Sequence, residues 1–148
     1  MARLVKDRPD VQVFTEIGII DQLVSNRLDR VLPAGLSHAQ FSVLTCFVRD
    51  GEAKIPAELA RLFQVTKVAM TNTLQRLEAQ GFVAIAADPA DGRKKQVSIT
   101  PAGVAAHDTA LHALRPMTES LRSAFTEQEF EAALPFLKAL RTWLDESR

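Results

Sequence analysis

The segment DPADGRKKQVSIT, residues 88–100, indicates the turn and return strand of a β-hairpin. It follows an apolar run, FVAIAA, and its Pro-Ala-Asp-Gly favours a turn because Asp and Gly tolerate the backbone angles that tight turns require. We therefore predict strands over residues 82–87 and 96–99. The turn between them presents three successive cations, Arg93, Lys94 and Lys95.

Four helices are predicted before this hairpin. The first runs from about Asp10 to Val31, where apolar residues recur with helical spacing and Pro33 and Gly35 follow. The remaining boundaries come from caps and breakers: the capping box Ser37-x-x-Gln40 and Gly51 for the second helix, Pro56 for the third, and Thr66 and Gly81 for the fourth.

Two helices are predicted after the hairpin. Thr100-Pro101 opens the fifth helix, which runs to about Ala124, and the capping box Thr126-x-x-Glu129 opens the sixth, which ends near Glu146. Each contains an interior proline, Pro116 and Pro135, which removes a hydrogen bond and clashes with the preceding turn. We expect a kink or a break at each proline.

This order of elements predicts a mainly α protein with a small β-hairpin wing. A short helix, a tight connection, a second helix and a two-stranded wing make a winged helix-turn-helix. We expect one compact domain overall with three parts. Residues 1–33 form an N-terminal dimerisation helix, residues 34–100 the winged DNA-binding lobe, and residues 101–148 the C-terminal dimerisation helices.

The fourth helix has one apolar face and one face of small, amide and cationic side chains. Asn and Gln can pair with adenine, Arg with guanine, and Ala or Val can touch a thymine methyl group. A solvated helix face carries similar residues, so this face is decisive only beside the cationic wing. The predicted contacts to DNA are Thr66, Lys67, Val68, Ala69, Thr71, Asn72, Gln75 and Arg76 on the helix, and Asp91, Arg93, Lys94 and Lys95 on the wing.

The run LARLFQVTKVAMTNTLQRLEAQGFVAIAADPADGRKKQVSITPAG resembles the DNA-binding core of the MarR family of bacterial transcriptional regulators. Its most specific part, DPADGRKKQVSITPAG, is similar to the wing signature Asp-x-x-Asp-x-Arg, an apolar strand and Thr-x-x-Gly. The resemblance implies a homodimer built from the first, fifth and sixth helices and bound to a double-stranded DNA operator. It also implies that Arg93 reaches the minor groove, held in position by Asp91, and that a small aromatic or phenolic effector releases the DNA.

Asp91 and Arg93 lie two residues apart around Gly92, close enough for a charge-assisted hydrogen bond that would orient the guanidinium. The alternative is that Asp91 only supports the turn, and the two roles are compatible.

The terminal helices contain more apolar surface than a thin layer over the winged lobe can bury. A second copy of the chain is therefore the expected cover. The residues predicted to form that contact are Phe14, Ile17, Leu121, Phe125, Phe136, Leu140, Trp143 and Leu144.

Charge is unevenly distributed although the net charge is zero. Residues 54–95 contain seven cations and four anions, a net of +3 (7 − 4), whereas from Pro116 onward six acids outnumber four bases. Zero net charge argues against a general polyanion-coating protein and supports a rival hypothesis, a winged-helix module that binds proteins rather than DNA. A small-molecule binding protein without a DNA target is a further alternative.

Three residues are candidate sensors. Cys46 is interpreted chiefly as a small buried hydrophobe and otherwise as a redox switch. His107 and His112 are five residues apart and do not share a helix face, although His38 could join one of them through the fold. Surface or ligand-pocket histidines are therefore favoured over the alternative, a zinc sensor. We expect no metal and no required cofactor. The sequence shows no motif of an enzyme, no membrane span and no signal peptide, and its single cysteine fits a reducing compartment, so we expect a cytoplasmic protein that is not an enzyme.

Overall fold

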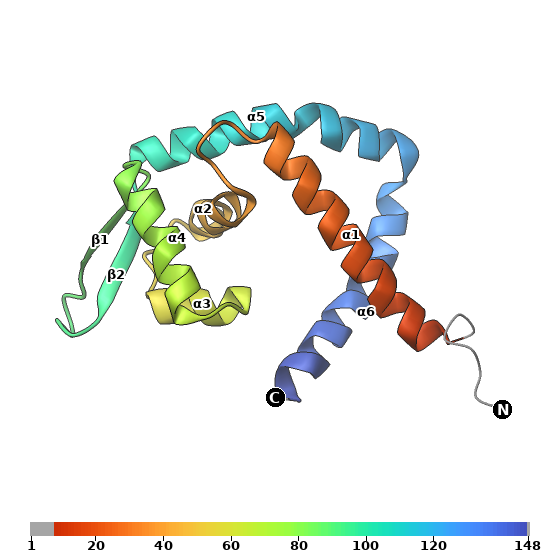
Figure 1. Cartoon of the computed structure of the whole chain (residues 1–148), viewed down its shortest axis with the longest axis horizontal. Helices are drawn as coiled ribbons and strands as arrows, with labels where there is room; N and C mark the ends of the chain where they lie inside the picture. Colours follow the sequence, from red (N-terminus) through yellow and green to blue (C-terminus); the bar gives the residue numbers. More distant parts are fainter. Residues whose placement is uncertain (1–7, 148) are drawn as a thin grey trace. The chain divides into compact units, whose positions relative to one another are not determined.

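The computed structural model describes residues 8–147 and contains six helices and one hairpin within that range (Figure 1). The elements are α1 (Pro9–Val31), α2 (His38–Asp50), α3 (Pro56–Phe63), α4 (Lys67–Ala79), β1 (Val83–Ala87), β2 (Lys95–Ile99), α5 (Pro101–Ala124) and α6 (Glu127–Glu146). This is the predicted order, with boundaries within one or two residues of those expected. The mainly α winged helix-turn-helix is confirmed.

Contacts divide the chain into two compact units, one ending at Ala113 and the other beginning at Leu114. The boundary lies inside α5, so α5 contributes its first half to the winged unit and its second half to the C-terminal unit. The roles assigned to residues 1–33, 34–100 and 101–148 remain predictions.

The winged unit is built around apolar side chains from α2, α3, α4 and the hairpin. Burying each of these side chains stabilises the fold by about 1.5–3 kcal/mol before the entropy of ordering it is subtracted. The largest fully buried side chains are Val43, Leu44, Phe47, Leu59, Leu74, Leu77 and Val97. Met70, Leu74 and Leu77 form the inner stripe of α4, so the opposite face of that helix is turned to solvent.

Local caps set the ends of these helices as predicted. The Ser37 and Gln40 capping box opens α2, and Gly51 ends it in the left-handed conformation. Thr66 caps α4 by accepting a hydrogen bond from the Ala69 N–H at 3.1 Å. The turn before it depends on Gln64, whose positive φ of 57° ends α3 and whose side-chain amide donates to the Arg61 carbonyl at 2.7 Å.

The hairpin pairs Val83 with Ile99 and Ala87 with Lys95 in antiparallel register. A third segment joins it, because Lys54 exchanges two backbone hydrogen bonds of 2.8 Å with Val97. No pattern in the sequence predicts this bridge. It ties the connection between α2 and α3 to the base of the wing.

Thr100 and Gly103 hold the wing against the start of α5. The Thr100 hydroxyl donates to the Gly81 carbonyl at 2.6 Å and accepts from the Gly103 N–H at 3.1 Å, and the Thr100 N–H donates to the Phe82 carbonyl at 3.0 Å. A Cβ on Gly103 would overlap the Phe82 carbonyl oxygen and lie 2.8 Å from the Ile99 Cγ1 atom. The Thr-x-x-Gly pattern is therefore a close-packed joint that requires glycine.

His107 on α5 is buried against α2. Thr45 donates its hydroxyl hydrogen to the Phe41 carbonyl at 2.9 Å, so at 3.1 Å it can only accept a hydrogen bond from the His107 Nε2 atom. The Phe41 ring stacks on the imidazole, and the buried Nδ1 atom has no hydrogen-bond partner. Burial lowers the pKa of His107, with Asp108 acting in the opposite direction. The imidazole is therefore held neutral with its proton on Nε2.

The C-terminal unit contains the end of α5 and all of α6. The predicted capping box is present, with Thr126 and Glu129 satisfying each other's backbone N–H groups. Neither helix breaks at its interior proline, because α5 continues through Pro116 and α6 through Pro135, while a kink at each proline stays a prediction. A proline removes one hydrogen bond from the helix, whereas the turns on either side keep theirs, so a long helix can contain it.

Candidate nucleic-acid interface

The solvent-facing side of α4 presents the residues that the sequence analysis selected. Lys67, Val68, Ala69, Thr71, Asn72, Gln75 and Arg76 are all exposed. Val68 is 71% exposed, an unusual position for a β-branched apolar side chain. Asn72 lies four residues after Val68, which places the two side chains one above the other on the same face.

The donors on this face are not used by the residues that the structure describes. Within residues 8–147, the side chains of Asn72, Gln75 and Arg76 make no hydrogen bond or ion pair with another residue. Amide and guanidinium groups that are exposed and unpaired can bond to base edges or phosphates without first breaking an internal contact. The α4 surface therefore has the chemistry of a major-groove reader.

The wing tip is ordered by two aspartates that accept backbone hydrogen bonds. Asp88 accepts from the Ala90 N–H at 2.8 Å, and Asp91 accepts from the Arg93 N–H at 3.1 Å. The Lys94 N–H and the Asp91 carbonyl close the same turn at 3.0 Å. Each is an Asx turn, in which an aspartate side chain accepts a hydrogen bond from the backbone N–H two residues later.

Asp91 therefore plays the turn-supporting role that the sequence analysis kept as its alternative. Among the described residues, no ion pair links its carboxylate with the Arg93 guanidinium, which was the expected contact. Asp91 instead fixes the backbone from which the Arg93 side chain leaves the hairpin. The guanidinium itself stays available to a ligand.

A cleft of about 390 Å³ separates α4 from the wing. Thr71 and Gln75 line it from the helix, and three cations line it from the hairpin: Arg93, Lys94 and Lys95. Pro56 and Glu78 also line this cleft, although the sequence analysis did not select them. Pro56 reaches the cleft because of where α3 packs, and Glu78 because of which side of α4 faces the wing. No sequence motif specifies either of these positions.

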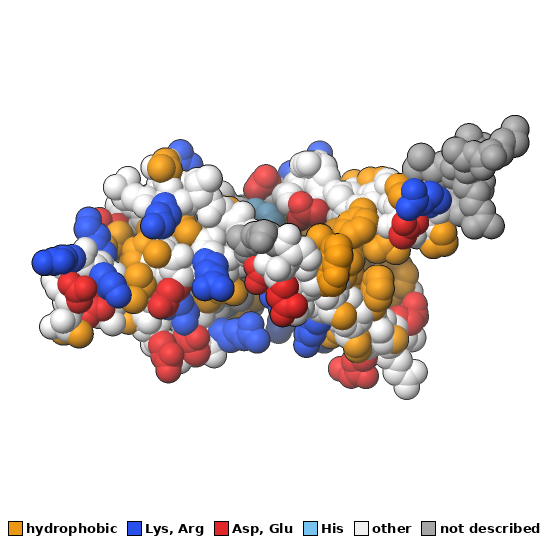
Figure 2. Space-filling model, turned by 90° about the horizontal axis from the view of Figure 1, so that it is seen from below, with side chains coloured by type: hydrophobic (Ala, Val, Ile, Leu, Met, Phe, Trp, Pro, Cys, Tyr) orange, Lys and Arg blue, Asp and Glu red, His pale blue; other side chains and the backbone are white. Residues whose placement is uncertain are grey.

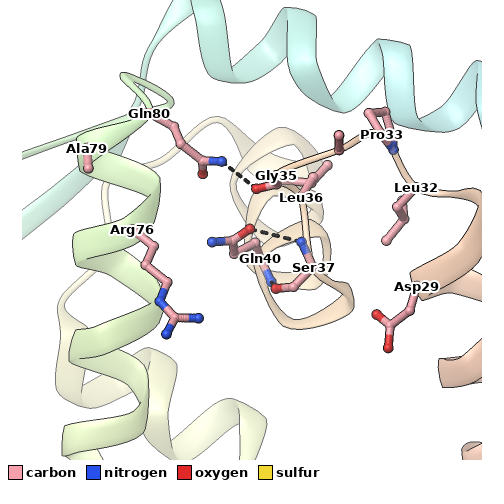
Figure 3. A pocket seen from close by; sticks show the side chains of 11 residues that line it. Asp29, Leu32, Pro33, Gly35, Leu36, Ser37, Gln40, Arg76, Ala79 and Gln80 are labelled. Carbon is pink, nitrogen blue, oxygen red and sulfur yellow. Dashed lines mark hydrogen bonds between the residues drawn. The ribbon is translucent and has the colours of Figure 1, made fainter.

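Arg76 does not join this group. It lines a different pocket, formed with the α1–α2 connection (Figure 3). The structure thus brings Thr71 and Gln75 together with the wing cations, whereas Arg76 lines the pocket beside the α1–α2 connection.

The candidate sensor residues are not gathered in one place. His38 lies beside Ser25, with 3.4 Å between its Nδ1 atom and the Ser25 hydroxyl, and His112 is exposed. Cys46 is half-buried in a pocket that Arg49 and Lys54 also line, so two cations lie near it in space although neither is adjacent to it in the sequence. Over residues 8–147, no group of three or more His, Cys, Asp or Glu side chains could hold a metal ion.

The terminal helices have large apolar side chains in contact with solvent in the single chain (Figure 2). Of the residues predicted to form the dimer contact, Leu140 is half-buried and the others are exposed: Phe14, Ile17, Leu121, Phe125, Phe136, Trp143 and Leu144. No described residue of α6 is buried.

The sequence model described as MarR family matches residues 34–94, the winged lobe. The multiple antibiotic resistance protein MarR of Escherichia coli strain K12 is 34% identical over 101 residues, which cover 63% of this chain and 69% of that protein. The transcriptional repressor NicR of Pseudomonas putida is 30% identical over 105 residues, 71% of this chain and 66% of that protein. The chain belongs to the MarR family.

Two solved structures of similar fold agree with this assignment. The crystal structure of a mutant MarR from Escherichia coli, complexed with operator DNA, has a TM-score of 0.77 and 26% identity, and covers 94% of this chain and 99% of that one. The structure of BpsR from Bordetella bronchiseptica, which concerns regulation of its DNA binding by 6-hydroxynicotinic acid, has a TM-score of 0.74 and 26% identity over 88% of this chain and 98% of that one.

Membership of the MarR family makes this protein a transcriptional regulator and confirms that it is not an enzyme. Among the helices described, none combines the length and apolarity needed to cross a bilayer.

Proposed function

We propose that this protein is a ligand-responsive repressor that binds a pseudo-palindromic DNA operator as a homodimer in the cytoplasm. Each chain places α4 in a major groove and its wing in the flanking minor groove. The observation that carries the proposal is the set of unpaired donors on α4 beside a cationic wing tip. The similarity to MarR solved with operator DNA and to the repressor NicR supports it.

The two chains divide the operator between them. A two-fold axis gives two half-sites about one helical turn apart, each read by one α4. The exposed apolar side chains of α1, α5 and α6 support the dimer, because a monomer that left them in water would present an unusually large apolar surface. The similarity to BpsR supports a small aromatic acid as effector.

Selection of bound fragments from random-sequence DNA would first identify the operator. Fluorescence anisotropy at matched salt would then compare the wild type with Arg93→Ala and with Arg49→Ala, an exposed arginine on α2 outside the proposed interface. We expect Arg93→Ala to weaken operator binding by about 1–3 kcal/mol and Arg49→Ala to have little effect. Equal affinity of the wild type and Arg93→Ala would refute the role of the wing.

Salt dependence separates this proposal from the protein-binding alternative. Log affinity should fall by roughly 0.9 for each phosphate neutralised, and Lys94→Ala should reduce the slope by about one such unit. A dependence on salt that is flat for the wild type would favour a module that binds proteins.

A further inference from the structure

Val68 presents its apolar side chain to solvent at the N-terminal end of α4. It is 71% exposed, more than any other large apolar side chain that the structure describes, and Trp143 follows at 63%. A β-branched residue is also mildly unfavourable inside a helix, because its side chain loses rotamer freedom there. A single exposed valine is common on protein surfaces, so its meaning depends on the residues around it.

Asn72 lies one turn further along α4 on the same face. Four residues of helix bring the two side chains within about 40° of each other around the helix axis and about 6 Å apart along it. Asn72 is exposed, and its amide has no hydrogen-bond partner among residues 8–147. Val68 and Asn72 therefore offer an apolar contact next to an unused donor and acceptor.

These two residues occupy the middle of the outward face of α4. On one side of them, Thr71 and Gln75 line the wing cleft, and on the other side Arg76 lines the pocket beside the α1–α2 connection. Both lie in the N-terminal half of the helix. The N-terminal residues of a recognition helix are the ones that reach base edges, so Val68 and Asn72 are placed to contact the floor of a major groove.

The backbone beneath this strip is held in place by the core. Met70 and Leu74, on the opposite face of α4, are 3% and 1% exposed. Thr66 fixes the first turn by accepting the Ala69 N–H at 3.1 Å. Valine has one strongly preferred rotamer in a helix, so Val68 presents its methyl groups in a single orientation and loses little conformational entropy on binding.

We propose that Asn72 reads an adenine in each operator half-site and that Val68 packs on the methyl group of a thymine within two base pairs of it. The Asn72 amide accepts from the adenine N6 amino group and donates to N7, a combination that adenine alone offers in the major groove. Val68 cannot hydrogen-bond, and the thymine methyl is the apolar group on that groove's edge. Base pairs are about 3.4 Å apart, so side chains about 6 Å apart along α4 contact bases no more than two steps apart.

This inference rests on the proposed function and specifies what the operator contains. Contacts from the wing cations to phosphate carry no sequence information and only position the protein on the duplex. Val68 and Asn72 are then the residues that determine specificity, and each half-site has a fixed adenine and a fixed thymine in its major groove.

Thymine-to-uracil substitution in the selected operator tests the Val68 contact. Uracil pairs with adenine as thymine does and lacks only the methyl group. The thymines are replaced one position at a time, in both half-sites together, and the affinity of the full chain is measured by fluorescence anisotropy at matched salt. At one position we expect the wild type to lose about fourfold in each half-site, and so roughly 15-fold in all.

Val68→Ala should bind the unmodified operator at least as weakly as the wild type binds that uracil operator, and should lose nothing further when the uracil is introduced. The variant keeps the fold, because the side chain is exposed and alanine is the best helix former. Val48→Ala is the matched control, since Val48 is an exposed valine on α2 that does not line the wing cleft. It should behave like the wild type on both operators.

Replacing adenine with 7-deazaadenine tests the Asn72 contact in the same way. This base keeps its pairing with thymine but has no acceptor at position 7. At one adenine, within two base pairs of the sensitive thymine, the wild type should lose about fivefold or more in each half-site. Asn72→Ala should be insensitive to the same substitution.

The results distinguish this inference from the function on which it rests. If every uracil substitution costs Val68→Ala as much as the wild type, or every 7-deazaadenine substitution costs Asn72→Ala as much, the inference is overturned. The proposed function then still stands, because the wild type binds its operator. If selection yields no duplex that the wild type binds in preference to random DNA, both fail.

Discussion

Replacing Gly103 with Ala tests the joint between the wing and α5. The added Cβ would overlap the Phe82 carbonyl oxygen, which is backbone and cannot turn away as a side chain could. The first turn of α5 must move away from the start of β1. That movement lengthens the bond from the Thr100 N–H to the Phe82 carbonyl and disturbs the bond from the Thr100 hydroxyl to the Gly81 carbonyl.

The expected cost follows from these contacts. Overpacking of a close contact costs about 1–3 kcal/mol, and each weakened hydrogen bond costs about 1 kcal/mol. Ala is favoured over Gly in a helix by at most about 1 kcal/mol, which offsets part of that cost. We expect Gly103→Ala to lower the free energy of unfolding by about 1–3 kcal/mol.

Urea denaturation followed by circular dichroism measures the effect at fixed protein concentration. Gly18→Ala is the matched control, because Gly18 lies inside α1 and a Cβ there meets no atom of residues 8–147 within 4 Å. It should raise the free energy of unfolding by about 0.5–1 kcal/mol, as glycine inside a helix is unfavourable. If Gly103→Ala is as stable as the wild type or more so, the close-packed joint is refuted.

Three other substitutions test separate features. Thr100→Val removes the hydroxyl that donates to the Gly81 carbonyl at 2.6 Å and accepts from the Gly103 N–H at 3.1 Å, so it should lower the free energy of unfolding by about 1–2 kcal/mol in the same urea assay. Thr109→Val, on an exposed face of α5, should lower it by less than half as much. Burial lowers the pKa of His107, so as pH falls below about 6.5 the unfolded chain binds a proton at this imidazole before the folded chain does, and stability is lost. His107→Leu should therefore lose less thermal stability than the wild type between about pH 7 and 5. An equal loss would contradict the neutral buried imidazole. Trp143 is 63% exposed in the single chain and should be covered by the partner in the dimer. Trp143→Asp should therefore weaken self-association by about 2–4 kcal/mol, measured by analytical ultracentrifugation, whereas Lys138→Asp should change it little.

Much of the fold could be predicted because its signals are local. A capping box joins residues three apart, so the starts of α2 and α6 can be predicted from Ser37-x-x-Gln40 and Thr126-x-x-Glu129. The hairpin needs only a turn sequence between two apolar strands. The outward face of α4 follows from helical periodicity, because burying Met70, Leu74 and Leu77 leaves the opposite side chains in solvent.

The interior prolines show the limit of local reasoning. Pro116 and Pro135 each disfavour a helix, yet both helices continue through them. The local cost is confined to about one turn, whereas the rest of each helix retains its hydrogen bonds. The free energy of the whole helix decides whether it continues, and the cost at a single proline does not.

By itself, the sequence determined the order of the elements, the helix ends, the cationic wing tip and the outward face of α4. Only the tertiary structure decided that Asp91 bonds to the Arg93 backbone, that Lys54 pairs with Val97, and that Arg76 faces Asp29 across a pocket. The last two depend on segments far apart in the chain, which the packing of the core brings together. The partner of Asp91 depends on whether the folded wing presents the backbone N–H or the guanidinium of Arg93 to its carboxylate. The backbone geometry decides this, and the residue types do not.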